Sequence, residues 1–220
     1  MMFTRSAAAR KWMFGLLALL AVGIGLYAFA FYGTIDSTHN TPFVESKADA
    51  SLPDLWYTVL WLHAISAGTA LGIGWLQFVK RIRRSSPNVH RLAGYLYSAG
   101  ITVGGVTGLY VAWYADGGMS GKIGFAALAL AWLYTLYRGL KSIYERNYGE
   151  HARWLTRNYA LTCAAIMLRI YLPVAAGLFG VSDTNDSFIV IAWLCWIPNL
   201  LFAEMINSGR RPARRRPVQL

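Results

Sequence analysis

Six long apolar runs, separated by short polar segments, occupy most of the chain. Each run holds about the 20 mostly apolar residues that an α-helix needs to cross the hydrocarbon core of a bilayer. Because backbone groups in lipid must be hydrogen-bonded within the segment itself, these runs are expected to be helices. The pattern therefore predicts an all-α integral membrane bundle of six transmembrane helices. The predicted spans are 12–33, 54–79, 92–115, 122–141, 154–180 and 187–207.

The polar segments divide the chain into four parts. Residues 1–33 form a basic N-terminal segment and the first predicted helix, and residues 34–53 form an outer loop. The other five helices make a membrane core over 54–207, and 208–220 form a basic tail that we expect to be disordered on the cytoplasmic side. The first apolar run has the basic start of a signal peptide. It continues beyond about 20 residues without a clear small-residue cleavage site, which favours a retained anchor.

The positive charges fall almost entirely on one side of these spans. Eighteen of the 21 Lys and Arg residues precede the first span or follow the second, fourth and sixth. Lys47 and Lys122 lie on the other side, and Arg169 lies inside a span. Since cytoplasmic loops of membrane proteins retain Lys and Arg, this distribution predicts that both termini are cytoplasmic.

The composition supports a membrane location and excludes several other classes. Hydrophobic residues make up 56% of the 220 residues, more apolar surface than a soluble domain of this size can bury. The formal charge of +11 is confined to short juxtamembrane clusters, which favour anionic lipid over nucleic acid as the partner. The chain has no P-loop, Cys-x-x-Cys, Gly-x-Ser-x-Gly or His-Glu-x-x-His motif, so no catalytic residue can be assigned.

Glycines spaced four apart occur along two of the spans. Gly68 and Gly72 lie in the second span, and Gly100, Gly104 and Gly108 lie in the third. Such stripes let another helix approach the backbone closely, which is the favoured interpretation. A planar cofactor lying against the stripe is the alternative.

Two ionisable side chains are expected in the outer half of the membrane. His63 lies in the inward-running second span and Arg169 in the outward-running fifth, at similar distances from their outer ends. Ionisable groups are costly at such depths, and no carboxylate of the predicted spans shares this level. A haem propionate, or a quinone oxygen facing His63, would provide the partner that Arg169 needs. The alternative, with equal weight, is that Arg169 caps a helix that is broken above Pro173.

A second histidine pair is expected at the cytoplasmic face. His90 and Arg91 open the third span, and His151 and Arg153 open the fifth, so that the two imidazoles start at matching depth. Two neutral histidines from facing helices are the usual axial ligands of a b-type haem in a membrane bundle, and neighbouring Arg residues can neutralise its propionates. His90 and His151 are therefore candidate iron ligands. Alternatively, each imidazole is an amphipathic anchor at the interface.

Glu204 lies near the cytoplasmic end of the last span, where an unpaired carboxylate is costly. Arg91, Arg138 and Arg157 are expected at a similar level. We expect one of them to form a structural ion pair with Glu204.

Several polar and aromatic motifs are distributed along the five-helix core. These motifs are His63 through Gln77-Phe78, His90-Arg91-x-x-Gly94-x-x-Tyr97, Trp132-x-x-Thr135, His151-x-Arg153-Trp154-x-x-Arg157-x-Tyr159-Ala160-Leu161-Thr162, Leu168-Arg169-x-x-Leu172-Pro173, Trp193-x-x-Trp196-x-Pro198-Asn199-Leu200 and Glu204. In these motifs the chain resembles a family of bacterial predicted membrane proteins catalogued only as a domain of unknown function. The resemblance covers about residues 55–207 and implies a membrane protein without an established activity.

A looser similarity is to the two-haem transmembrane b-type cytochromes. Those proteins also have six helices, and they take haem ligands from the third helix with the fifth and from the second with the fourth. His90 and His151 match the first pair. The second pair is incomplete, because His63 is present but the span 122–141 contains no histidine. The similarity implies one haem at most.

Two functions from different classes remain open for this multi-pass protein, which we expect in the cell inner membrane. The first is electron transfer, with a haem b held by His90 and His151 and a quinone near His63 and Arg169. The second is a cofactor-free accessory or assembly subunit that packs beside other membrane subunits. Transport is a weaker third hypothesis, because the sequence shows neither an inverted repeat nor paired broken helices.

Overall fold

The computed structural model describes residues 7–47, 51–181 and 183–209, which form helices joined by turns, with no strand in these ranges. This confirms the all-α class. Residues 1–6 and 210–220, which include most of the predicted basic tail, lie outside the described residues. The elements are α1 Ala7–Phe31, α2 Ile35–Thr38, α3 Pro42–Glu45, α4 Asp54–Gly74, the 3₁₀ turn η1 Trp75–Phe78, α5 Lys80–Ser85, α6 Pro87–Trp113, α7 Gly118–Tyr144, α8 Tyr148–Thr162, α9 Ala164–Phe179, α10 Thr184–Leu194 and α11 Ile197–Ser208.

Five helical stretches of the described chain are long and apolar enough to cross a membrane. The third predicted span is also helical, as the 27-residue α6, but this helix is less apolar than the other five stretches. Its composition explains the difference, because small and hydroxyl-bearing residues alternate with its apolar ones. The five stretches are Ala8–Phe31, Asp54–Phe78, Gly118–Tyr144, Tyr148–Phe179 and Asn185–Ser208.

The last two of these stretches are each interrupted, which corrects the expectation of continuous helices over 154–180 and 187–207. The first interruption is at Cys163, between α8 and α9, and the second is at Cys195 and Trp196, between α10 and α11. Pro173, in contrast, lies inside α9, which continues through it. Paired interrupted helices are therefore present, and Pro198, in the first turn of α11, is a local signal for the second interruption.

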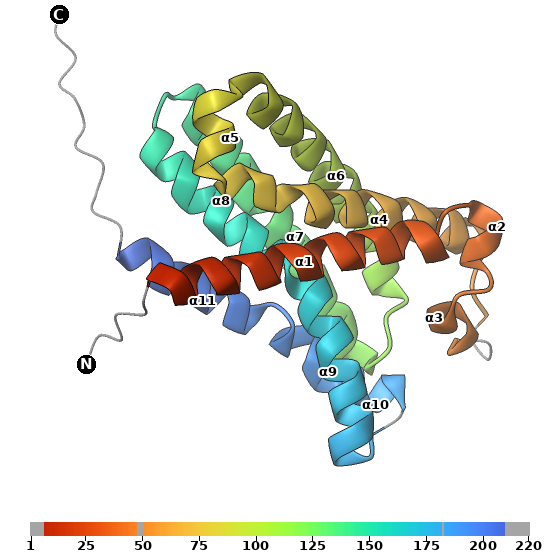
Figure 1. The fold of residues 1–220 in the computed structure, drawn as a ribbon. Coiled ribbons are helices and arrows are strands. Elements are labelled where there is room, and N and C mark those ends of the chain that lie inside the picture. The colour runs from red at the N-terminus through yellow and green to blue at the C-terminus, as the bar shows by residue number, and fades with distance from the viewer. Residues whose placement is uncertain (1–6, 48–50, 182, 210–220) are drawn as a thin grey trace, which may run out of the picture.

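The glycine stripes bring helices together, as their spacing predicted. Gly68 and Gly72 of α4 face Gly25 of α1, where an added Cβ at Gly25 would lie 3.0 Å from the Gly68 carbonyl oxygen. Gly100 of α6 faces the backbone of Ser66 in α4, where an added Cβ would lie 2.8 Å from the carbonyl oxygen. These contacts place α4 between α1 and α6 (Figure 1).

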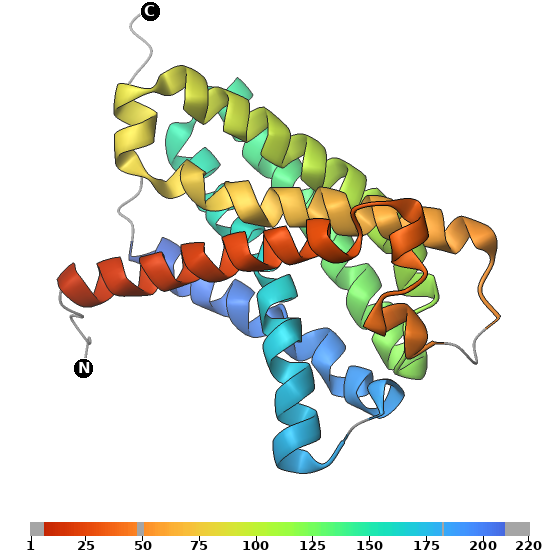
Figure 2. The same cartoon turned by 45° about the vertical axis from the view of Figure 1, so that its right-hand side comes forward.

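Figures 1 and 2 show the start of α1, α5 and the end of α11 at one end of the molecule, with α2 and α3 at the opposite end. In both views α9 and α10 form a hairpin that projects away from α5 and α6. The predicted outer loop, residues 34–53, contains the two short helices α2 and α3. Thr41 caps α3 by accepting a hydrogen bond from the Val44 amide at 3.3 Å.

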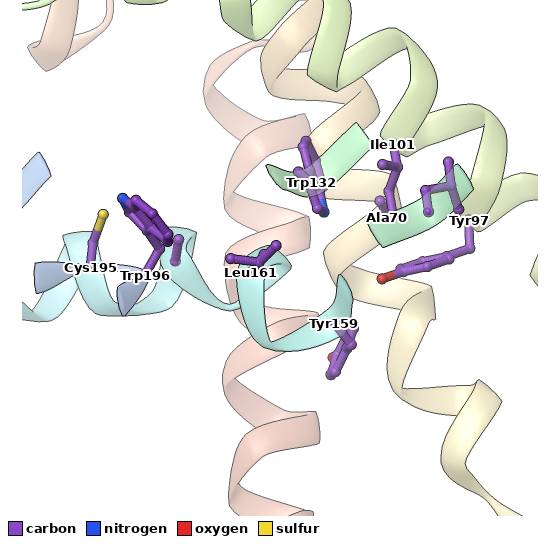
Figure 3. Packing of buried hydrophobic residues seen from close by; sticks show 10 residues of the cluster. Ala70, Tyr97, Ile101, Trp132, Tyr159, Leu161, Cys195 and Trp196 are labelled. Atoms are coloured by element: carbon purple, nitrogen blue, oxygen red, sulfur yellow. The ribbon is translucent and has the colours of Figure 1, made fainter. Parts of the chain in front are cut away.

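The main buried cluster joins α4, α6, α7 and α8 to the second helix interruption. Figure 3 shows Tyr97 beside Ala70 and Ile101, with Trp132, Tyr159 and Leu161 nearer the middle of the view and Cys195 and Trp196 at the opposite side. Trp132, Leu161, Ala164 and Cys195 of this cluster also line a cavity between the helices. The buried members of the cluster are Ala70, Tyr97, Ile101, Trp132, Leu136, Tyr159, Leu161, Ala164, Cys195 and Trp196.

Candidate functional site

A cavity of about 360 Å³ opens between α1, α4, α6, α7 and α9, and both His63 and Arg169 line it. The helices thus place on one cavity wall the two residues that were expected at similar depth. His63 comes from α4 and Arg169 from α9. Neither His90 nor His151 belongs to this wall.

Most of the cavity wall is apolar, with several aromatic rings. Thr162, Ala164 and Cys195 also contribute, so both helix interruptions border the cavity. A mostly apolar wall with a few polar groups is typical of a small-molecule site. The aromatic residues that line it are Tyr27, Tyr32, Phe43, Trp56, Tyr114, Phe125, Trp132 and Phe188.

His63 is fixed by the backbone of α6. Its Nδ1 lies 2.8 Å from the carbonyl oxygen of Gly104, so Nδ1 carries the proton and donates it to this bond. Gly108 leaves room for the ring, because a Cβ at that position would lie 3.1 Å from His63 Cε1. The glycine stripe of α6 therefore has a second role, which is to seat this imidazole.

Arg169 has no carboxylate partner among the described residues. Its Nη1 donates to the carbonyl oxygen of Ala165 at 3.0 Å, and its guanidinium lies 5.0 Å from the centre of the Tyr27 ring. The ion pairs of the described chain involve other residues. The contact with Ala165 lies within α9, and Pro173 does not interrupt that helix, so Arg169 does not cap a break there.

Lys47, from the segment after α3, also lines the cavity, and the sequence analysis assigned it no role. Its side chain is buried, with Nζ 2.5 Å from Asp116 Oδ1 and 2.9 Å from the carbonyl oxygen of Tyr114. The pair ties the segment after α3 to the turn between α6 and α7. Lys47 and Tyr114 both line the cavity, so their contact is part of its wall.

A buried polar network holds α6, α7 and α8 in register below the cavity. The Tyr97 hydroxyl donates to Asn158 Oδ1 at 2.7 Å, and Asn158 Nδ2 donates to the Trp132 carbonyl oxygen at 2.7 Å and to Thr135 Oγ1 at 2.8 Å. Trp132 Nε1 donates to Thr162 Oγ1 at 2.9 Å. Each member comes from a motif that was noted in the sequence or from its immediate neighbourhood.

The network also bears on the predicted histidine pair. His90 precedes Tyr97, and His151 precedes Asn158, each by seven residues or about two helical turns. His90 lies before the predicted span 92–115. Burial lowers the pKa of His90, and the positive charges of Arg83 and His151 lower it further.

The two histidines differ in their hydrogen bonds. His90 Nδ1 is buried without a partner in the described chain. His151 Nδ1 lies 2.9 Å from the carbonyl oxygen of Gly139. Of the two expected propionate partners, Arg91 is exposed and Arg153 pairs with Glu150 at 3.1 Å.

Of the three arginines that were expected as candidates, Arg157 is the one that pairs with Glu204. Its Nε lies 2.5 Å from Oε1 and its Nη2 lies 2.8 Å from Oε2, so the pair is bidentate and joins α8 to α11. Arg157 also lies against the Trp154 ring at 4.4 Å from its centre. These contacts support the structural role that was predicted for Glu204.

Residues 60–207 match the family described as predicted membrane protein (DUF2306). This range contains α6 to α10 entirely, most of α4 and α11, and both residues of the cavity pair. Searches of curated proteins and of solved structures each found no match.

Proposed function

The chain belongs to that family of predicted membrane proteins, and from this premise we propose that it binds a lipophilic molecule of the quinone class in the cavity beside His63 and Arg169. The proposal includes a six-span topology in the inner membrane with both termini cytoplasmic. Electron transfer is the activity that such a ligand would serve.

The distribution of charge supports this topology. The exposed basic helix α5 lies at the same end of the molecule as the start of α1 and the end of α11 (Figures 1 and 2). An odd number of spans would put the two ends on opposite sides, so α6 is required as the sixth span. Its lower hydropathy is compatible with this, because α4 and α7 cover its polar and glycine-rich face.

The observation that carries the ligand proposal is Arg169, a guanidinium on an apolar cavity wall with no carboxylate partner in the described chain. A guanidinium stays charged at accessible pH and is costly inside a bilayer unless acceptors surround it. A ring with oxygen substituents supplies acceptors to Arg169 and an apolar body to the aromatic wall. The volume of about 360 Å³ lies in the range of small-molecule sites, and an isoprenoid tail would extend into lipid.

Fluorescence titration tests this proposal, because Trp56 and Trp132 both line the cavity. We expect decylquinone, added to the purified protein in nanodiscs, to quench tryptophan emission saturably at micromolar concentration. The matched control is decane, which has a similar tail without ring oxygens. Linear quenching that is identical for both compounds would remove the proposal and favour a cofactor-free accessory subunit.

A second proposal, a b-type haem between His90 and His151, has its own supporting observation. His90 and His151 each lie seven residues before a partner of the Tyr97–Asn158 bond, which supports a similar level for the two imidazoles, and His90 Nδ1 is buried without a partner in the described chain. The bond from His151 Nδ1 to Gly139 leaves the other ring nitrogen for a metal, as second-shell bonds commonly do. When bound, the haem would supply a one-electron carrier.

The absorption spectrum of the purified protein separates these possibilities. A Soret band that sharpens on dithionite reduction, and disappears in His151→Ala, supports the haem. A colourless protein that still binds decylquinone leaves the cavity as the functional site. A colourless protein that binds neither supports the accessory-subunit hypothesis.

A further inference from the structure

We propose that the ligand of the cavity must carry a hydroxyl group, so that the site binds the reduced quinol in preference to the oxidised quinone. This inference rests on the proposed quinone-class ligand. It follows from which hydrogen-bonding groups His63 and Arg169 present to the cavity.

His63 presents an acceptor. The 2.8 Å contact between Nδ1 and the Gly104 carbonyl oxygen requires a proton on Nδ1, because two acceptors would repel at that distance. The carbonyl belongs to the backbone of α6 and cannot turn away. In the neutral imidazole the other nitrogen, Nε2, then has a lone pair and no proton. Within the described chain Nε2 has no hydrogen-bond partner, so a ligand can reach it only by donating.

The doubly protonated form of His63 is excluded by its surroundings. Arg169, a second cation, lines the same cavity, and most of the wall is apolar. A second cation there would be desolvated and repelled without a carboxylate nearby to offset it. His63 is therefore neutral and acts as a hydrogen-bond acceptor.

Arg169 presents donors only, since a guanidinium has no acceptor. A ligand that satisfies both residues must donate to His63 and accept from Arg169. One hydroxyl can do both, and the two hydroxyls of a quinol can each do one. A quinone carbonyl or an ionised carboxylate satisfies Arg169 but directs lone pairs at His63 Nε2. The arrangement thus discriminates by hydrogen-bond polarity, so the quinone binds at the same site but more weakly than the quinol.

The direct test compares decylquinol with decylquinone on wild-type protein in nanodiscs under argon, with tryptophan quenching as the readout. We expect the quinol to bind at least about tenfold more tightly, because one unmatched buried hydrogen bond has roughly that effect. This comparison needs no variant, so it does not depend on how a substitution folds.

The variant His63→Asn tests the assigned residue. Its amide nitrogen can keep the bond to the Gly104 carbonyl oxygen, but the side chain offers no acceptor where Nε2 stood. The preference for quinol should fall to about one. His39→Asn is the matched control, because His39 stacks on Tyr57 at 4.0 Å and does not line the cavity. Its preference should equal that of the wild type.

The outcomes separate the two proposals. Equal affinity of the wild type for both forms overturns the hydroxyl requirement and leaves the quinone-class site in place. Tighter binding of lauric acid than of either form overturns both, because a carboxylate would then be the preferred head group. Binding of neither form also overturns both.

Discussion

The Tyr97 hydroxyl donates a 2.7 Å hydrogen bond to Asn158 Oδ1, and this buried contact sets the register of α6 against α8. His90 and His151 each lie seven residues before one partner of this contact, so the same contact bears on how the two histidines are placed. Asn158 is fully buried and also bonds to the backbone and a side chain of α7. A single amide therefore connects three helices.

Replacing Asn158 by Leu should destabilise the protein by about 2 kcal/mol, because Tyr97 and the Trp132 carbonyl lose a partner while burial is retained. Thermal unfolding in detergent measures the change. Asn88→Leu, at an exposed position near the start of α6, should leave the transition temperature within experimental error. Equal stability of the two variants would contradict the role assigned to the network.

The Lys47–Asp116 ion pair predicts that losing the cation alone destabilises the protein more than losing both charges. Lys47→Met should leave the Asp116 carboxylate half-buried without its cation and destabilise the outer segment by about 2 kcal/mol. Adding Asp116→Asn removes the unpaired charge and should restore most of the loss. Hydrogen exchange of residues 35–47 reports the local opening, and Lys80→Met at an exposed position serves as the control. Additive effects of the two substitutions would show that the residues are not coupled.

The glycine stripe of α6 predicts a loss of ligand binding without a loss of fold. Gly108→Val adds a branched side chain against His63, whose ring already lies 3.1 Å from the position of a Cβ. The imidazole must move away from the Gly104 carbonyl oxygen, and we expect decylquinol affinity to fall about tenfold. Gly23→Val in α1 is the matched control, since nothing lies within 4 Å of a Cβ there. Unchanged affinity in Gly108→Val would separate His63 from the ligand.

The spans were predictable because long apolar runs leave few alternatives in a membrane protein. The second run was expected over 54–79 and is helical as Asp54–Phe78. The interruption at Cys163 was not predictable, because neither Cys163 nor its immediate neighbours are helix-breaking residue types. The second interruption has a local signal that the prediction did not use: Pro198 lies in the first turn of α11, where its missing N–H and its ring oppose continuation of α10. Pro173, in contrast, lies within an unbroken helix.

The sequence indicated part of the candidate site. Counting along the predicted helices put His63 and Arg169 at a similar depth, and both line the cavity. The cost of an unpaired carboxylate named Arg157 among the possible partners of Glu204, and the two residues form an ion pair. Lys47 was missed, because its loop has no periodic apolar pattern from which a fold over the cavity could be predicted. The bond from His63 to Gly104 was also missed, since backbone contacts between helices depend on their rotation.

The most direct test of the cavity site is the affinity of decylquinol for Arg169 variants. Arg169→Leu suits a membrane helix and should insert normally, so any loss of binding reports the missing guanidinium. Arg169→Lys keeps the charge but not the planar set of donors, and should rescue binding only in part. Arg84→Leu, in the exposed helix α5, controls for the loss of one positive charge.

Isothermal titration of these four proteins in nanodiscs is the measurement. The wild type and Arg84→Leu should bind equally, Arg169→Lys more weakly, and Arg169→Leu at least about tenfold more weakly than the wild type. Wild-type affinity in Arg169→Leu would contradict the account, because the guanidinium on the cavity wall would then have no part in holding the ligand.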